Sequence, residues 1–231
     1  MRPVRRGGQP GKYTDHPLAK GDLMRAIGAY CSYCERPFPE DVEHVLPKLE
    51  YPNLRLHWGN FLLACKSCND TKKNQQIMVS PPASRIDRWA YLWPDTDNTA
   101  RAFVYSRTEI SVALGLGPLT PLAEATRKMT GFHKTPGSPN PPDSPKDHRW
   151  EFRDAQWVLA ERYRAKMAAE PANLSLREAA ADLAAGNGFW SVWRTVFAGD
   201  ADMLRRLNEA FAGTAPCFDP TTLQPSTRGR L

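Results

Sequence analysis

Hydrophobic and polar positions follow helical spacing near both ends of the chain and form short apolar runs in between. Apolar residues three and four apart predict a helix over about 17–29, which Asp15 can cap. The same spacing predicts four helices within 150–213, the second opening at a capping box, Ser175-Leu176-Arg177-Glu178. The C-terminal half is therefore expected to be mainly α-helical.

The middle of the chain has the pattern of short strands. Residues 42–46 are a strand candidate, 51–58 a loop or second strand, and 68–76 a short helix. We therefore expect a β-hairpin followed by a helix. A second strand pair is expected at 102–105 and 110–114, followed by a helix near 119–129.

These elements and the local composition indicate an α+β protein with distinct segments. Proline and glycine are frequent at 131–149, which reads as an exposed linker. The expected segments are a basic flexible arm (1–14), a central module (15–80), a mixed α/β extension (81–130), the linker (131–149), a helical lobe (150–213) and a tail (214–231).

The charge of the chain favours a polyanionic partner. Its 231 residues carry a net charge of +6 and give a pI of about 9.1. Lysine and arginine displace counterions from phosphates, so this excess permits nucleic-acid binding without proving it. No apolar run approaches the roughly 20 residues that cross a bilayer, and no apolar segment follows the basic first residues. The expected location is the cytoplasm, with no membrane partner.

Four of the five cysteines occur in two C-x-x-C pairs. The pairs are Cys31 with Cys34 and Cys65 with Cys68. A C-x-x-C turn presents two sulfurs to one ion, and zinc takes four thiolates tetrahedrally. We therefore expect a structural zinc ion that closes the base of the hairpin, although four reduced core cysteines would give the same spacing. The fifth, Cys217, is expected to be a buried thiol.

An acidic residue and a histidine lie between the cysteine pairs. His44 can deprotonate water near neutral pH, and the neighbouring Glu43 can bind a divalent cation. Asn69 directly follows Cys68, where its amide oxygen could complete the ion site. Strict strand alternation would turn Glu43 and His44 to opposite sides, so a bulge is expected there. His16, His133 and His148 carry no functional signal in the sequence.

This combination resembles the HNH nuclease family, which has the ββα-metal fold. The matching phrases are Asp41-Val42-Glu43-His44-Val45-Leu46-Pro47, Gly59-Asn60-Phe61-Leu62-Leu63 and Cys65-Lys66-Ser67-Cys68-Asn69 with Lys72. They cover about a third of the chain. The resemblance implies a zinc-stapled ββα-metal module, joined here to a small strand pair and a mainly helical C-terminal lobe.

The resemblance also implies roles for the residues of the motif. His44 would be the general base, and Glu43 and Asn69 would hold one catalytic ion. Asn60 would brace the loop and orient His44. Many members have histidine in place of Asn69, and this difference favours hard ions such as Mg²⁺ or Mn²⁺. Phosphate contacts would come from Lys66, Lys72 and Lys73, and Asp41 is a candidate for an auxiliary metal role.

A second similarity concerns the whole chain. Its motif phrases and its helical C-terminal half resemble the HNH subunits of Septu-type bacterial antiphage systems, which work beside an ABC-type ATPase. The chain has no G-x-x-x-x-G-K-[ST] loop, so a partner would have to use the ATP. The predicted function is metal-dependent DNA cleavage in defence against foreign DNA. A zinc-organised binding module that does not cut, and an RNase with the same site, remain open as alternatives.

Overall fold

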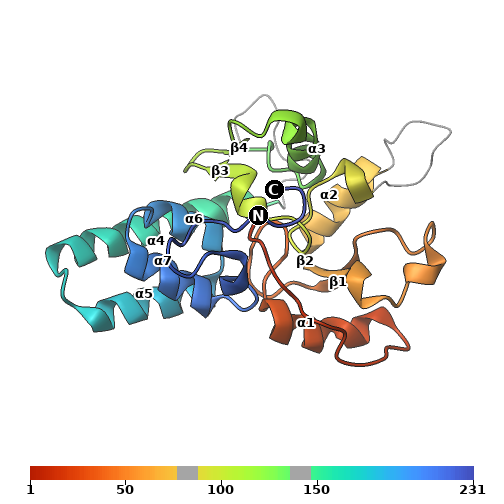
Figure 1. Cartoon of the computed structure of the whole chain (residues 1–231), viewed down its shortest axis with the longest axis horizontal. Helices are drawn as coiled ribbons and strands as arrows, with labels where there is room; N and C mark the ends of the chain where they lie inside the picture. Colours follow the sequence, from red (N-terminus) through yellow and green to blue (C-terminus); the bar gives the residue numbers. More distant parts are fainter. Residues whose placement is uncertain (77–87, 136–146) are drawn as a thin grey trace.

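The computed structural model describes residues 1–76, 88–135 and 147–231 of the chain (Figure 1). The α+β fold is confirmed. In chain order its helices and strands are α1 (Lys20–Ile27), β1 (Asp41–His44), β2 (Phe61–Ala64), α2 (Lys66–Gln76), β3 (Phe103–Tyr105), β4 (Ile110–Val112), α3 (Thr120–Met129), α4 (Arg149–Ala169), α5 (Leu174–Asn187), α6 (Trp190–Val196) and α7 (Ala201–Ala210). A 3₁₀ turn, η1 (His16–Ala19), precedes α1.

The first two strands form a β-hairpin as expected, but its second strand is Phe61–Ala64, and the candidate at 51–58 contains a 3₁₀ turn, Pro52–Leu54. The two strands pair antiparallel, with Asp41 opposite Ala64 and His44 opposite Phe61. All four residues of β2 are buried, because α1 packs against β2 and α2 packs against β1. The register runs without interruption, so the bulge expected at Glu43–His44 is absent. No bulge is needed, because Glu43 finds partners for its charge inside the fold.

The rest of the chain forms two further parts around a pair of hydrophobic cores. β3 and β4 pair antiparallel as expected, and α3 packs against β4. One core joins this extension to the hairpin and includes Leu63 and Trp93. The other lies within the helical lobe α4–α7 and includes Trp193 and Phe211. Figure 1 shows the lobe on one side of the molecule and the hairpin with α1 and α2 on the other, with both chain ends between them.

The first residues do not form the expected flexible arm. Met1 to Val4 are buried, and the Arg2 guanidinium donates hydrogen bonds to the Ala212 carbonyl at 2.8 Å and to the Thr214 hydroxyl. Arg6 donates to the Trp58 carbonyl at 2.8 Å. Both arginines bind backbone carbonyls of segments far along the chain, and the composition of residues 1–14 does not reveal these contacts.

The C-terminal segment also packs inward. Leu231 is buried, and Arg228 donates to the Val4 carbonyl at 2.9 Å. The expected tail at 214–231 therefore closes against the first residues. Most of the expected linker, 136–146, lies outside the described residues, while its flanks Phe132 and Arg149 are buried.

Two helix starts differ in detail from expectation. Asp15 does cap, but it caps η1, and α1 ends at Ile27 because Gly28 takes a left-handed φ of 78°. α5 begins at Leu174, and its cap is Asn173, whose side chain accepts a hydrogen bond from the Leu176 amide at 2.9 Å. Among the described helices, none combines the length and the apolar character that a membrane span requires.

Candidate active site and metal centre

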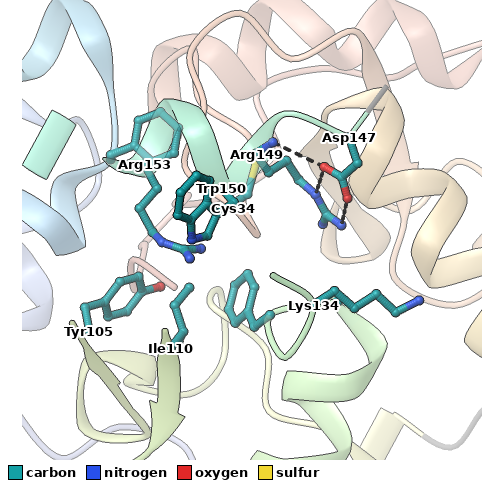
Figure 2. A pocket seen from close by; sticks show the side chains of 11 residues that line it. Cys34, Tyr105, Ile110, Lys134, Asp147, Arg149, Trp150 and Arg153 are labelled. Atoms are coloured by element: carbon teal, nitrogen blue, oxygen red, sulfur yellow. Dashed lines mark hydrogen bonds and ion pairs between the residues drawn. The ribbon is translucent and has the colours of Figure 1, made fainter. Parts of the chain in front are cut away.

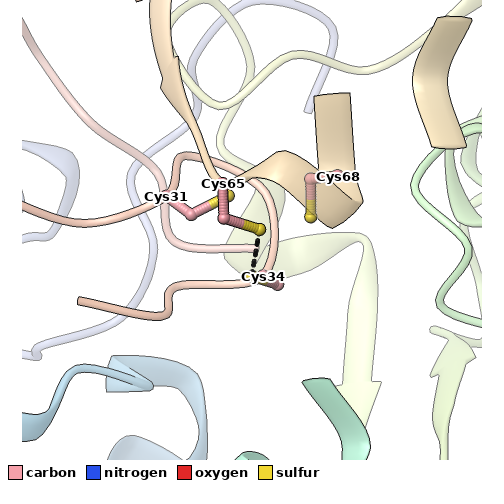
Figure 3. A group of neighbouring side chains, drawn as sticks. All are labelled: Cys31, Cys34, Cys65 and Cys68. Carbon is pink, nitrogen blue, oxygen red and sulfur yellow. Dashed lines mark hydrogen bonds between the residues drawn. The ribbon is translucent and has the colours of Figure 1, made fainter. Parts of the chain in front are cut away.

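The four paired cysteines converge on one point (Figure 3). Their sulfur atoms all lie within 4.8 Å of one another, and the Cys34 and Cys65 sulfurs are 3.6 Å apart. Tetrahedral zinc with Zn–S bonds of about 2.3 Å places its sulfurs roughly 3.8 Å apart. The cluster therefore fits a zinc ion in the geometry expected from the spacing. Cys217 is buried away from this cluster.

The start of α4 supplies a positive charge to the cluster. Arg149 is buried and donates a hydrogen bond to the Cys68 sulfur at 3.2 Å and another to the Thr130 carbonyl at 2.7 Å. Asp147 holds the same guanidinium through two carboxylate contacts (Figure 2). Burial raises the pKa of Cys68, but hydrogen bonds from the neighbouring thiols and the Arg149 charge bring it well below its ordinary value. The helical lobe thus stabilises a thiolate.

His44 is the last residue of β1, and one of its ring nitrogens is hydrogen-bonded to the protein backbone. Its Nε2 lies 2.9 Å from the Arg55 carbonyl oxygen. A carbonyl only accepts, so Nε2 carries the proton and Nδ1 keeps its lone pair in the neutral ring. Burial lowers the pKa of His44, and the Arg55 carbonyl only partly opposes this. The imidazole is therefore neutral at neutral pH, in the tautomer that leaves Nδ1 free to take a proton.

Glu43 is buried beneath the same strand. Its two oxygens accept hydrogen bonds from the Tyr33 hydroxyl at 2.7 Å and from the Lys72 ammonium. Burial, reinforced by the Glu43 charge, holds the pKa of Tyr33 well above its usual range, so its hydroxyl remains a donor. Both carboxylate oxygens thus have protein partners.

Asp41 and Asn69 lie side by side at the edge of the cleft. The Asn69 amide nitrogen donates to Asp41 Oδ2 at 2.8 Å, which turns the amide oxygen away from that carboxylate oxygen. No donor within the described ranges bonds to Asp41 Oδ1 or to Asn69 Oδ1. A carboxylate and an amide oxygen suit a hard divalent ion. For such an ion these two oxygens are better placed than those of Glu43.

Asn60 is buried and braces the loop that follows β1. Its side chain accepts from the Leu46 amide at 2.8 Å and donates to the Leu46 carbonyl at 2.9 Å. It also donates to the Leu54 carbonyl at 3.3 Å, next to the Arg55 carbonyl that His44 contacts. Asn60 therefore fixes the backbone that presents this carbonyl.

A cleft with a volume of about 550 Å³ is bordered by Asp41, Glu43, His44 and Asn69. Exposed Lys66 and Lys73 lie at its edge, where they are open to a phosphate. Lys72 needs a correction, because its ammonium is buried and donates to Glu43 and to the carbonyls of His44 and Val45. It cannot serve as the expected phosphate contact. The cleft is lined by His16, Pro17, Lys20, Glu40, Asp41, Val42, Glu43, His44, Pro47, Lys48, Leu49, Lys66, Asn69, Lys72 and Lys73.

Three residues that contribute to these sites were not among those expected from the sequence. Tyr33 occupies a variable position inside the first C-x-x-C, and Arg149 follows the proline-rich segment. His16 places its ring 4.8 Å from that of His44, measured between centroids. Only the tertiary fold brings them together, although the acidic neighbour of His16, Asp15, is a local signal for an oriented imidazole.

Comparison with known proteins identifies the segment that carries the sites. Residues 31–75 match the family model described as HNH endonuclease. A Septu protein PtuB from Bacillus thuringiensis is 38% identical over an alignment of 88 residues that covers 32% of this chain and 34% of the relative. The match thus spans about a third of that curated relative. No solved structure matches the chain.

Proposed function

With residues 31–75 belonging to the HNH endonuclease family, we propose that this chain is a metal-dependent endonuclease that hydrolyses DNA phosphodiester bonds. The observation that carries the proposal is the cleft in which His44, Asp41 and Asn69 meet from the hairpin and α2. It combines an imidazole whose tautomer is set, two oxygen ligands and a basic edge. Each is a requirement of phosphodiester hydrolysis.

His44 is the general base of the proposed reaction. Its Nδ1 takes a proton from water, and the water oxygen forms a bond to phosphorus as the bond from phosphorus to the 3′ oxygen breaks. The departing 3′ oxygen takes a proton from solvent. The products are a 5′-phosphate and a 3′-hydroxyl. The Arg55 carbonyl keeps the ring oriented throughout, and its hydrogen bond stabilises the imidazolium that forms.

Asp41 and Asn69 would hold the catalytic divalent ion, with the negative charge of Glu43 nearby. When bound, Mg²⁺ or Mn²⁺ supplies positive charge that offsets the phosphate and the departing oxygen. Asp41→Asn should therefore raise the Mn²⁺ concentration that gives half-maximal cleavage. The four cysteines would hold a zinc ion with all four of its coordination positions filled, so that the ion would serve the fold.

The similarity to Septu protein PtuB supports a role in antiphage defence. In this proposal the chain acts on foreign DNA beside an ABC-type ATPase subunit. Such a partner would explain how a nuclease is restrained until it is needed. Co-purification of the chain with a co-expressed ABC-type ATPase subunit would test the partnership directly.

The decisive experiment compares wild-type protein with His44→Ala on plasmid DNA with Mg²⁺ or Mn²⁺, alone and with the partner ATPase. Wild type should cut, whereas His44→Ala should cut about 10²–10⁴-fold more slowly with its fold and zinc intact. His148→Ala is the matched control, because it removes a hydrogen-bonded histidine that lies outside the cleft. Cleavage of RNA alone would reassign the substrate. No cleavage in any condition, with phage defence unaffected by His44→Ala in cells, would overturn the proposal.

A further inference from the structure

His16 stands in the proposed active site although it lies outside the matched segment. Its ring centroid is 4.8 Å from that of His44, with 52° between the ring planes, and both side chains line the cleft. η1, which carries His16, packs against β1. The cleft thus has α2, with Asn69, on one side and a second imidazole on the other.

A carboxylate orients the His16 ring. Asp15 Oδ1 lies 3.0 Å from His16 Nδ1 and also accepts the His16 backbone amide at 2.8 Å. Hydrogen bonding from that amide and from the ring lowers the pKa of Asp15, so the carboxylate is charged. With Nδ1–H donated to Asp15, Nε2 is the ring nitrogen left to meet a ligand. The side chain is 23% exposed, which leaves it open to the cleft.

The remaining charged groups near His16 favour an anion. Lys20, Lys48 and His44 line the same cleft. Its acids already have partners: Glu40 pairs with Arg36, Asp41 accepts from Asn69, and Glu43 pairs with Lys72. A phosphate that approaches His44 would therefore meet His16 and two ammonium groups. While Nδ1–H donates to Asp15, an Nε2–H of the same ring can donate to a phosphate oxygen.

We propose that His16, oriented by Asp15, is a catalytic residue that donates a hydrogen bond from Nε2 to the phosphate attacked by water from the His44 side. The proposal rests on the nuclease function argued above and adds a substrate contact to it. His44 would handle the proton of the water, and His16 would bind the negative charge that grows on the phosphate oxygens.

The test measures binding of a short DNA duplex to wild type and variants without added divalent ion, over a range of salt concentrations. Loss of one cationic phosphate contact lowers the slope of log affinity against log salt by about one. His16→Ala should weaken binding and show this lower slope. His16→Arg, which keeps a cation, should restore the slope, and His148→Ala should bind like wild type.

The outcomes separate the two proposals. If wild type binds and His16→Ala matches its affinity and slope, the His16 contact is wrong and the nuclease assignment stands. Weaker binding by His16→Ala with an unchanged slope would mean a packing role beside His44, which also overturns the contact. If wild type binds neither DNA nor RNA, both proposals fall together.

Discussion

The Lys72 ammonium and the Glu43 carboxylate form a buried ion pair beneath the cleft. The pair links α2 to β1, and Lys72 also donates to the carbonyls of His44 and Val45 at 2.6 and 3.1 Å. Lys72 therefore holds the strand that carries the proposed base. Removing its ammonium would leave the Glu43 carboxylate buried without a countercharge.

Lys72→Met should destabilise the protein strongly. Removing one partner of a buried ion pair costs about 3–5 kcal/mol, because the other charge stays buried without compensation. The free energy of unfolding from urea titration measures this loss. Lys73→Met, on the exposed neighbour, should change stability by no more than about 0.5 kcal/mol. Equal effects of the two substitutions would refute the structural role of Lys72.

In the pH profile of cleavage, the midpoint of the fall in rate toward acid pH should lie below the ordinary histidine pKa of about 6.5. Burial lowers the pKa of His44, so the ring stays unprotonated, and able to accept a proton, at pH values below 6.5. A cation bound in the cleft would shift the pKa in the same direction. The pH profile of kcat/KM with Mn²⁺ tests this. A midpoint above pH 6.5 would mean that His44 is not the base.

Cys65→Ala should lose zinc and unfold the hairpin module. Structural zinc sites contribute folding energy directly, and three thiols cannot complete the tetrahedron. Zinc content and circular dichroism follow the two losses. Cys217→Ala removes a buried thiol outside the cluster and should keep its zinc. A Cys65→Ala protein that is folded and loaded with zinc would show that the cluster has another role.

Arg149→Met should release zinc to a chelator more readily. The substitution removes the guanidinium that contacts the Cys68 sulfur, and outer partners of metal ligands typically change affinity by roughly 10–100-fold. A competition assay with a coloured chelator gives the ratio. Arg162→Met, on the exposed surface of the same helix, is the control. If both proteins hold zinc equally, the contact contributes nothing to the site.

The four-cysteine cluster and the hairpin could be predicted because local spacing encodes them. Two C-x-x-C turns present sulfurs in pairs, and short apolar runs before a polar helix indicate a hairpin and α2. The partners of Glu43 could not be predicted, because a buried carboxylate is satisfied by side chains from elsewhere in the fold. The local sequence predicts a surface cation at Lys72, since nothing near it in the chain distinguishes it from Lys73.

The first residues of the chain also have contacts that their own composition does not predict. Arginine and glycine near the start indicate an exposed arm, yet Arg2 and Arg6 each bind carbonyls far along the chain. His16 gave no functional signal for a related reason: its neighbour in the cleft, His44, lies on a different element. Composition describes a segment, whereas these roles depend on what packs against it.

The bond from Arg149 to the Cys68 sulfur means that the nuclease segment is not a detachable part. A fragment that stopped at residue 135 would keep the four clustered cysteines and every cleft residue but would strip the helical lobe from the metal centre. Its thiolates would face water in place of a guanidinium. Attempts to transplant the segment that matches the HNH model into another protein should therefore carry the start of α4 with it.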